Sequence, residues 1–186
     1  MEIRRKTAET IELDPRLGQF LDPAYFYEFM RNPDVVRSKD DALRGGINCV
    51  SLAHLVLKEL FDYELPPELG CAELYRDQDF LIRDIDPNES RKGDLWWFGV
   101  NSGKDPLKLP LHYDDQGRLI NWYESPVKHV AIHTGSYADG EPLLLHATHR
   151  NGGKNAVWPV SGFSSYNKYK QFWGITRLAV DQTVRV

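Results

Sequence analysis

The longest hydrophobic pattern in the chain follows a pair of glycines at positions 45 and 46. From Val50 to Phe61 apolar residues recur at helical spacing, and the polar residues are confined to one edge. This pattern predicts a helix that is buried over most of its surface. Cys49 then lies in the first turn of the helix, where unpaired amide groups and the helix dipole favour a negative charge.

The second half of the chain shows patterns typical of strands. Residues 95–100 form a short apolar run, and residues 127–134 alternate between two faces. A glycine-bearing connection joins 127–134 to the next strand, at 142–149, and predicts a hairpin. Two more strands are expected at 156–160 and 172–178. Because helices come first and an antiparallel sheet follows, the order predicts an α+β fold.

The N-terminal part is patterned more weakly. We expect residues 1–21 to form an arm that lies on the domain. Asp22 and Pro23 predict a helix cap, with a helix from Ala24 to about Arg31. Residues 32–46 are expected to be a polar loop that leads to the glycine pair. The segment from Cys71 to Phe80 fits neither a helix nor a strand clearly.

Composition indicates one globular domain that spans residues 1–186, with 41% hydrophobic and 12% aromatic residues. Residues 101–126 are rich in proline, glycine and aspartate, and are expected to form an inserted loop or lid. A net charge of −4 and the lack of a basic run argue against nucleic acid as a partner. The chain contains no run of about 18 apolar residues, so we expect no membrane partner.

The N-terminus is charged and lacks the apolar segment of a secretory signal. The location is therefore unknown, and both a cytoplasmic protein and one exported by an unseen route are compatible with the sequence. The chain contains two cysteines, Cys49 and Cys71, so there is no disulfide framework to interpret. A disulfide between the two would leave Cys49 unable to act as a nucleophile. Cys71 is expected to be structural.

Two histidines on neighbouring predicted strands are candidates for chemistry with Cys49. A period of two places His129, Ala131 and His133 on one face of the first strand. An adjacent antiparallel strand can present His146 beside His129. If the start of the cysteine helix packs against that face, a thiol, a proton-accepting imidazole and an orienting group come together.

Four motifs resemble, in order, those of NlpC-type cysteine peptidases. They are Asn48-Cys49 at a helix start, Gly93-Asp94-Leu95-Trp96-Trp97-Phe98, His129-Val130-Ala131-Ile132-His133-Thr134-Gly135, and Leu145-His146-Ala147. The resemblance covers about residues 40–178 and implies a papain-like core, with the nucleophile helix packed on an antiparallel sheet. It implies Cys49 as nucleophile, His129 as general base and His146 as the orienting residue. It also implies that the Asp94 carboxylate ties down the turn before its strand.

The chain departs from this family at several positions. The family has Ser-Gly after its cysteine, where this chain has Val50-Ser51, and residues 32–48 lack the tyrosine that family members carry near the oxyanion site. The 101–126 segment is also longer than the usual link. Substrate binding is expected at Asn48, Trp122 and Tyr123.

The function that follows is a thiol-dependent hydrolase, which cleaves an amide or peptide bond through a thioester and needs no cofactor or metal. The resemblance implies a peptidoglycan stem peptide as the substrate. The same trio could support a deamidase or an acyltransferase. Two alternatives remain open: a non-catalytic peptide-binding module on the same fold, and a zinc site. The histidines that could form that zinc site are His129, His133, His146 and His149.

Overall fold

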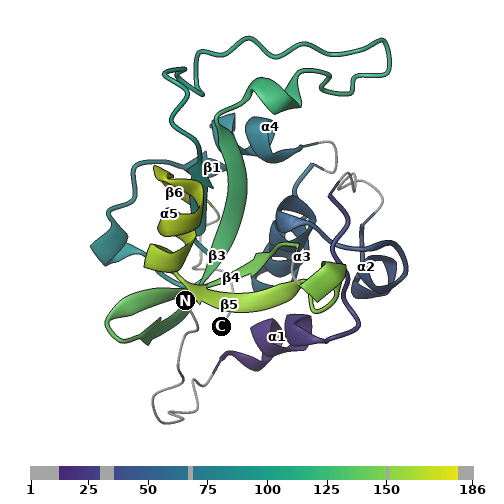
Figure 1. The fold of residues 1–186 in the computed structure, drawn as a ribbon, viewed down its shortest axis with the longest axis vertical. Coiled ribbons are helices and arrows are strands. Elements are labelled where there is room, and N and C mark those ends of the chain that lie inside the picture. Colours follow the sequence, from purple (N-terminus) through teal and green to yellow (C-terminus); the bar gives the residue numbers. More distant parts are fainter. Residues whose placement is uncertain (1–12, 30–35, 67–68, 150, 180–186) are drawn as a thin grey trace.

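The computed structural model describes residues 13–29, 36–66, 69–149 and 151–179. Within these residues, strands form a six-stranded antiparallel sheet in the order β1-β6-β2-β3-β4-β5. Helices lie on both sides of this sheet (Figure 1). The fold is therefore mixed α+β with an antiparallel sheet, as the order of patterns predicts.

The elements have the following bounds. The helices are α1 (Pro15–Gly18), α2 (Lys39–Gly45), α3 (Cys49–Phe61), α4 (Cys71–Arg76) and α5 (Gly162–Tyr169), with short 3-10 turns η1 (Gln19–Leu21), η3 (Pro87–Glu89), η4 (Trp122–Glu124) and η5 (Asn151–Gly153). The strands are β1 (Leu81–Ile82), β2 (Leu95–Gly99), β3 (Val127–Ala138), β4 (Glu141–Ala147), β5 (Val157–Ser161) and β6 (Gln171–Leu178).

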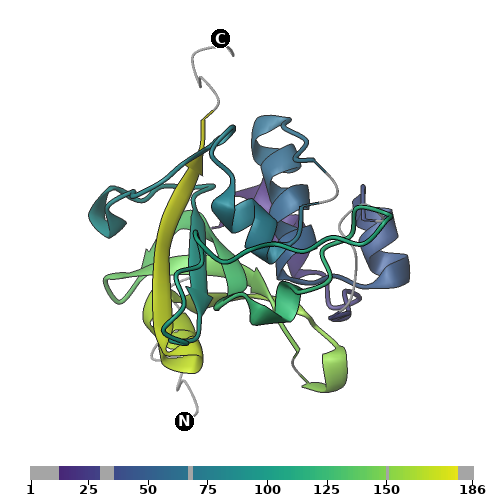
Figure 2. The same ribbon diagram turned by 90° about the horizontal axis from the view of Figure 1, so that it is seen from above.

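The larger core lies between the sheet and the helices of the N-terminal half. Helix α3 is buried along almost its whole length and packs on β3 and β4. In Figure 2 the purple and blue helices lie together on one side of the yellow strand β6. This burial explains why the apolar pattern from Val50 to Phe61 is so wide, because a helix covered on nearly all sides needs few polar positions.

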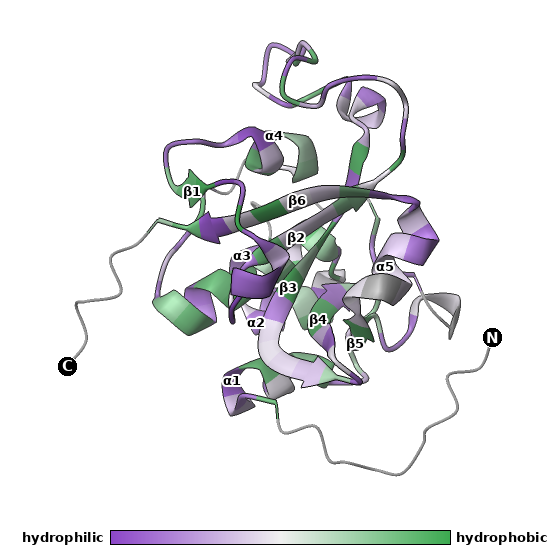
Figure 3. Ribbon diagram, turned by 90° about the vertical axis from the view of Figure 1, so that its left-hand side faces the viewer, coloured by the Kyte–Doolittle hydropathy of each residue, from purple (hydrophilic) through white to green (hydrophobic). Residues whose placement is uncertain are grey.

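A smaller aromatic core covers the other face of the sheet. Trp96 and Phe98 of β2 pack there with Ala131 of β3 and with Phe172 of β6. Helix α5 lies on this side, where Gly162 leaves room for the Trp96 ring. Figure 3 shows the hydrophobic segments of β2 and β3 in the middle of the sheet, between α3 and α5. The predicted strand 95–100 is thus apolar on both faces because both faces are covered.

Two predictions for the N-terminal half are wrong. Residues 24–29 form no helix; instead Phe26 and Tyr27 make isolated bridges to Lys154 and Ile47, and residues 30 and 31 lie outside the described ranges. Tertiary pairing has overridden a local helix cap there. The loop expected over 32–46 contains α2, which starts after the Ser38 cap and has two aspartates in its first turn.

The described part of the expected arm is residues 13–21. Leu17 of α1 and Phe20 of η1 are completely buried in the larger core. The segment 71–80, which had no clear pattern, begins with helix α4. Asp94, expected to tie down a turn, does so: its carboxylate accepts the Arg91 N–H at 2.8 Å.

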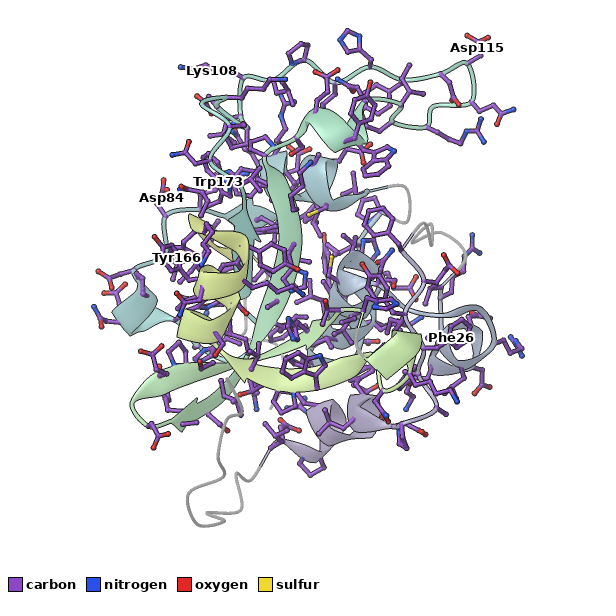
Figure 4. All side chains as sticks on the ribbon, viewed as in Figure 1. Phe26, Asp84, Lys108, Asp115, Tyr166 and Trp173 are labelled. Atoms are coloured by element: carbon purple, nitrogen blue, oxygen red, sulfur yellow. The ribbon has the colours of Figure 1, made fainter. Side chains whose placement is uncertain are left out.

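Residues 101–126 form the long excursion that their composition predicts. It extends from the sheet at the top of Figure 1, and Figure 4 labels Lys108 and Asp115 along it. A bridge between Tyr113 and Leu119 closes a small hairpin at its far end. Among the described residues, no helix has the length and apolar character needed to cross a bilayer.

Candidate active site

Helix α3 begins at Asn48 and Cys49 with a reciprocal cap. The Asn48 side-chain oxygen accepts the Ser51 N–H at 2.9 Å, and the Ser51 hydroxyl accepts the Asn48 N–H at 2.9 Å. The cap places the Cys49 thiol at the positive end of a 13-residue helix, as predicted. The side-chain oxygen of Asn48 serves this cap, and its contact with a substrate stays a prediction.

His129 and His146 lie side by side. The Nε2 atom of His129 and the Nδ1 atom of His146 are 2.9 Å apart, and the two rings meet edge to face. The hydrogen bond and the charge of His129 also lower the pKa of the Cys49 thiol, which places that thiol close to the imidazole. The structure thus brings the three predicted residues into one chain of thiol, imidazole and imidazole, while their catalytic roles stay predictions.

The route by which Cys49 reaches His129 differs from the expected one. Helix α3 packs with Val130 and Ile132, not with the face that carries His129 and Ala131. Among the described residues, the ladder between β3 and β4 ends at Ile132 and Leu145. Beyond that point the backbone N–H of Val130 is available to the Cys49 sulfur, which accepts a hydrogen bond from it. The thiol therefore meets His129 where the two strands separate.

The surroundings of Cys49 hold its pKa well below the usual range of a thiol. The largest cause is a hydrogen bond from the Cys71 thiol, and burial opposes it. The hydrogen bond and charge of His129 and the Val130 N–H lower the pKa further. A thiolate is the nucleophilic form of cysteine, so this environment is suited to a reactive sulfur.

Cys71 influences the ionisation of Cys49, and its predicted structural role stays a prediction. It was expected to be structural because no histidine or basic residue lies near it in sequence. In the fold it opens α4, and the hydrogen bond with Cys49 and burial raise the pKa of the Cys71 thiol well above its usual range, with the charge of Lys128 opposing them. Both cysteines are free thiols. The 22-residue separation of the two thiols carries no local signal that would have predicted their contact.

Two tyrosines also reach the site. Tyr27 pairs with Ile47, close to the start of α3, and the charge of Cys49 contributes to raising its pKa, after burial. Tyr169 stacks on the His129 ring, with centroids 4.7 Å apart and planes at 15°. Residues 32–48 contain no tyrosine, and Tyr27 comes to the start of α3 from an earlier segment.

An exposed row of aromatic rings leads away from Tyr27. Phe29 lies 6.5 Å from Tyr27 and 5.6 Å from Trp122, and Trp122 lies 6.1 Å from Tyr123, measured between ring centroids. Trp122 is 40% exposed and Tyr123 is 61% exposed. The two predicted substrate-binding aromatics thus lie on one surface that continues towards the cysteine helix.

The remaining histidines do not join this site. His133 is completely buried and contacts Ser90 and Trp96; burial lowers its pKa. It lines a shallow depression of about 460 Å³. His149 is exposed and meets the Tyr27 ring edge to face. Within the described ranges, no group of three or more histidine, cysteine or acidic side chains is placed to hold a metal ion.

The reactive groups are largely covered in this structure. Cys49 is 7% exposed, His129 2% and His146 1%. Tyr169 covers the His129 ring, and Lys168 beside it donates a hydrogen bond to Thr148 at 2.8 Å. A ligand would therefore reach the sulfur only after displacement of side chains that cover it.

Comparison with known proteins adds no assignment. The chain matches no model of a known protein family, and a search of curated proteins finds none that is similar.

Proposed function

We propose that this chain is a cysteine hydrolase with a papain-like, NlpC-type core. Two observations carry the proposal: His129 lowers the pKa of the Cys49 thiol through its hydrogen bond and charge, and His129 lies 2.9 Å from His146. A nucleophile, a base within hydrogen-bond reach and a third group that orients the base are the parts such an enzyme needs. A capped nucleophile helix packed on an antiparallel sheet supports the papain-like assignment.

The reaction follows from these positions. The Cys49 thiolate attacks the carbonyl carbon of an amide, and His129 gives its Nδ1 proton to the leaving amine. A thioester on Cys49 remains. His129 then takes a proton from a water molecule whose oxygen attacks the thioester carbonyl, and the carboxylic acid leaves from the sulfur. His146 accepts the Nε2–H of His129 throughout, which fixes the orientation of the base.

The oxyanion formed in both steps needs donors. The backbone N–H of Cys49 lies in the first turn of α3 and has no partner within the helix. Tyr27 is a second donor: burial raises its pKa, so its hydroxyl keeps its proton. A well-placed donor of this kind contributes about 3–4 kcal/mol to the transition state.

The surface near the site favours an anionic peptide. Lys128 lies near Cys71 and Lys168 lies near Cys49, so two ammonium groups flank the reactive sulfur. The aromatic row that contains Trp122 offers flat apolar contact beside them. Both features suit a peptidoglycan stem peptide, which carries several carboxylates, and agree with the substrate implied by the resemblance.

The test is incubation of the protein with peptidoglycan fragments and a library of small amides, followed by mass spectrometry of the products. We expect new amine and carboxylate ends with the wild type and none with Cys49→Ala or His129→Ala. His112→Ala is the matched control, because His112 is exposed and away from the trio, and it should retain full activity.

Three other outcomes would indicate an activity other than cleavage of a peptide. Products that carry an added acyl acceptor would indicate an acyltransferase, and conversion confined to side-chain amides would indicate a deamidase. Tight binding of a peptide without turnover, equal for the wild type and Cys49→Ala, would indicate a binding module.

A further inference from the structure

The last turn of helix α5 brings a charged side chain to the edge of the candidate site. The helix ends at Tyr169, whose ring stacks on the His129 ring with the centroids 4.7 Å apart and the planes at 15°. The residue before it, Lys168, has its Nζ atom 5.2 Å from the centre of the Tyr169 ring. The Lys168 ammonium group is therefore one aromatic ring away from the proposed base.

A hydrogen bond holds this ammonium group in place. Lys168 Nζ donates to the hydroxyl oxygen of Thr148 at 2.8 Å. Thr148 is buried, lies two residues after His146 in the chain, and donates its own backbone N–H to the Ala156 carbonyl at 3.0 Å. The helix dipole favours a lysine in the last turn of a helix. It does not account for a side chain that reaches across to the end of β4.

The Lys168 ammonium group still has donors to offer a ligand. An ammonium group carries three N–H donors, and Thr148 uses one of them. In the part of the chain that the structure describes, no carboxylate forms an ion pair with Lys168. Lys168 is also an exposed residue, so a ligand can reach it from solvent. A carboxylate is the group that completes such a set of donors best, because its bonds to an ammonium group are charge-assisted.

We propose that Lys168 binds a carboxylate of a peptide, close to the amide that the proposed hydrolase cleaves, and so selects acidic peptides over uncharged ones. That the peptide is a substrate rests on the proposed function, whereas the binding of a carboxylate does not. One hydrogen-bonded charge pair at an exposed position corresponds to a preference of about 10-fold. Salt screens an exposed pair, so the preference should fall as the ionic strength rises.

The test measures peptide binding to Cys49→Ala by isothermal titration calorimetry, because this variant leaves the peptide intact. Three short peptides of otherwise identical sequence are compared. The first has a glutamate beside its central amide and an amidated C-terminus, the second has glutamine in place of that glutamate, and the third is the glutamine peptide with a free C-terminus. We expect an acidic peptide to bind about 10-fold more tightly than the uncharged one. The acidic peptide that shows this preference identifies the carboxylate as that of a side chain or of the chain end.

Variants in the same Cys49→Ala background assign the preference to one residue. Lys168→Met should remove it, and Lys168→Arg, which keeps the charge, should retain it. Lys128→Met is the matched comparison, because the Lys128 ammonium group donates to the Tyr123 carbonyl at 2.7 Å and has no ring contact with the site. This variant should keep the preference, as should Lys108→Met at an exposed position on the 101–126 segment. Unfolding temperatures check that each variant is folded.

Kinetics give a second measure with Cys49 present. Lys168→Met should raise KM for the preferred acidic peptide by about 10-fold with little change in kcat, because the carboxylate contact is made equally in the bound substrate and in the transition state. A residue needed only to hold α5 in place would instead lower kcat for all three peptides.

Equal affinity for the three peptides overturns the proposal, as does a preference that survives Lys168→Met or a failure of both acidic peptides to bind. Calorimetry reports binding without any turnover. A Lys168-dependent preference in a protein that hydrolyses nothing therefore contradicts the proposed function alone. Hydrolysis of acidic and uncharged peptides with equal KM contradicts the role of Lys168 alone.

Discussion

The Nε2 atom of His129 lies 2.9 Å from the Nδ1 atom of His146, on the neighbouring strand. With His129 protonated at Nε2, His146 is the acceptor, and the contact sets which nitrogen of His129 remains for Cys49. In the proposed mechanism a histidine in this place has the role that a carboxylate or an amide has in other trios, which is to orient the base.

Replacement of His146 tests this role. His146→Ala should lower kcat by about 10²-fold, within the range attributed to positioned acid–base groups, with little change in KM. His146→Asn, which can still accept the Nε2–H, should recover part of that loss. Steady-state kinetics on the cleaved peptide give the comparison, with His112→Ala as the control. Equal kcat values for the alanine variant and the wild type would remove His146 from the mechanism.

The ionisation of Cys49 is the second point open to measurement. The rate of its alkylation by iodoacetamide should rise with the thiolate fraction. The midpoint of that rise should lie at a pH well below the pKa of an ordinary cysteine, which is about 8.5. Removal of the Cys71 hydrogen bond in Cys71→Ala, or of His129 in His129→Ala, should move the midpoint of the pH profile upwards. Peptide mapping after alkylation distinguishes the two cysteines. A midpoint unchanged in both variants would contradict the assigned causes.

Buried His54 of α3 makes stability depend on pH. Burial lowers its pKa to about 4. The unfolded chain, with an ordinary value near 6.5, binds the proton first as the pH falls. Folding stability is therefore retained above about pH 6.5 and lost between there and about pH 4, by about 3 kcal/mol in all.

His54→Leu removes this titration. Urea unfolding at several pH values should show a flatter dependence for the variant than for the wild type over the same interval. His133 has a lowered pKa in both proteins and leaves a common residual slope. If the two slopes coincide, His54 is not the group responsible.

The ion pair between Asp94 and Arg177 should stabilise the sheet far more than a surface pair does. Asp94 is buried, and the guanidinium donates two hydrogen bonds of 2.8 Å to its carboxylate. Asp94→Ala leaves the Arg177 charge without this partner and should cost about 3–5 kcal/mol. Lys108→Ala, which breaks the exposed pair with Asp105, should cost about 0–1 kcal/mol. Equal losses of unfolding free energy for the two variants, measured by denaturant unfolding, would show that burial does not determine how much an ion pair stabilises this protein.

Several features of the site could be predicted from local sequence. The start of α3 at Cys49 follows from a cap and a helical period that are contained in a few residues. The pairing of His129 with His146 follows from two alternating patterns joined by a hairpin, because a short turn places successive strands side by side. These signals depend on residues close together in sequence, and the structure contains the helix start and the hairpin that they predict.

What the sequence determined by itself was therefore the set Cys49, His129 and His146 and the α+β order of elements. The fold alone decided that α3 packs on the Val130 side of β3, and that Tyr27, Cys71 and Tyr169 converge on the sulfur. Those contacts join segments far apart in the chain, and their free energy comes from burial shared by the whole core. No local pattern of residues encodes which distant side chain that packing brings to a given point.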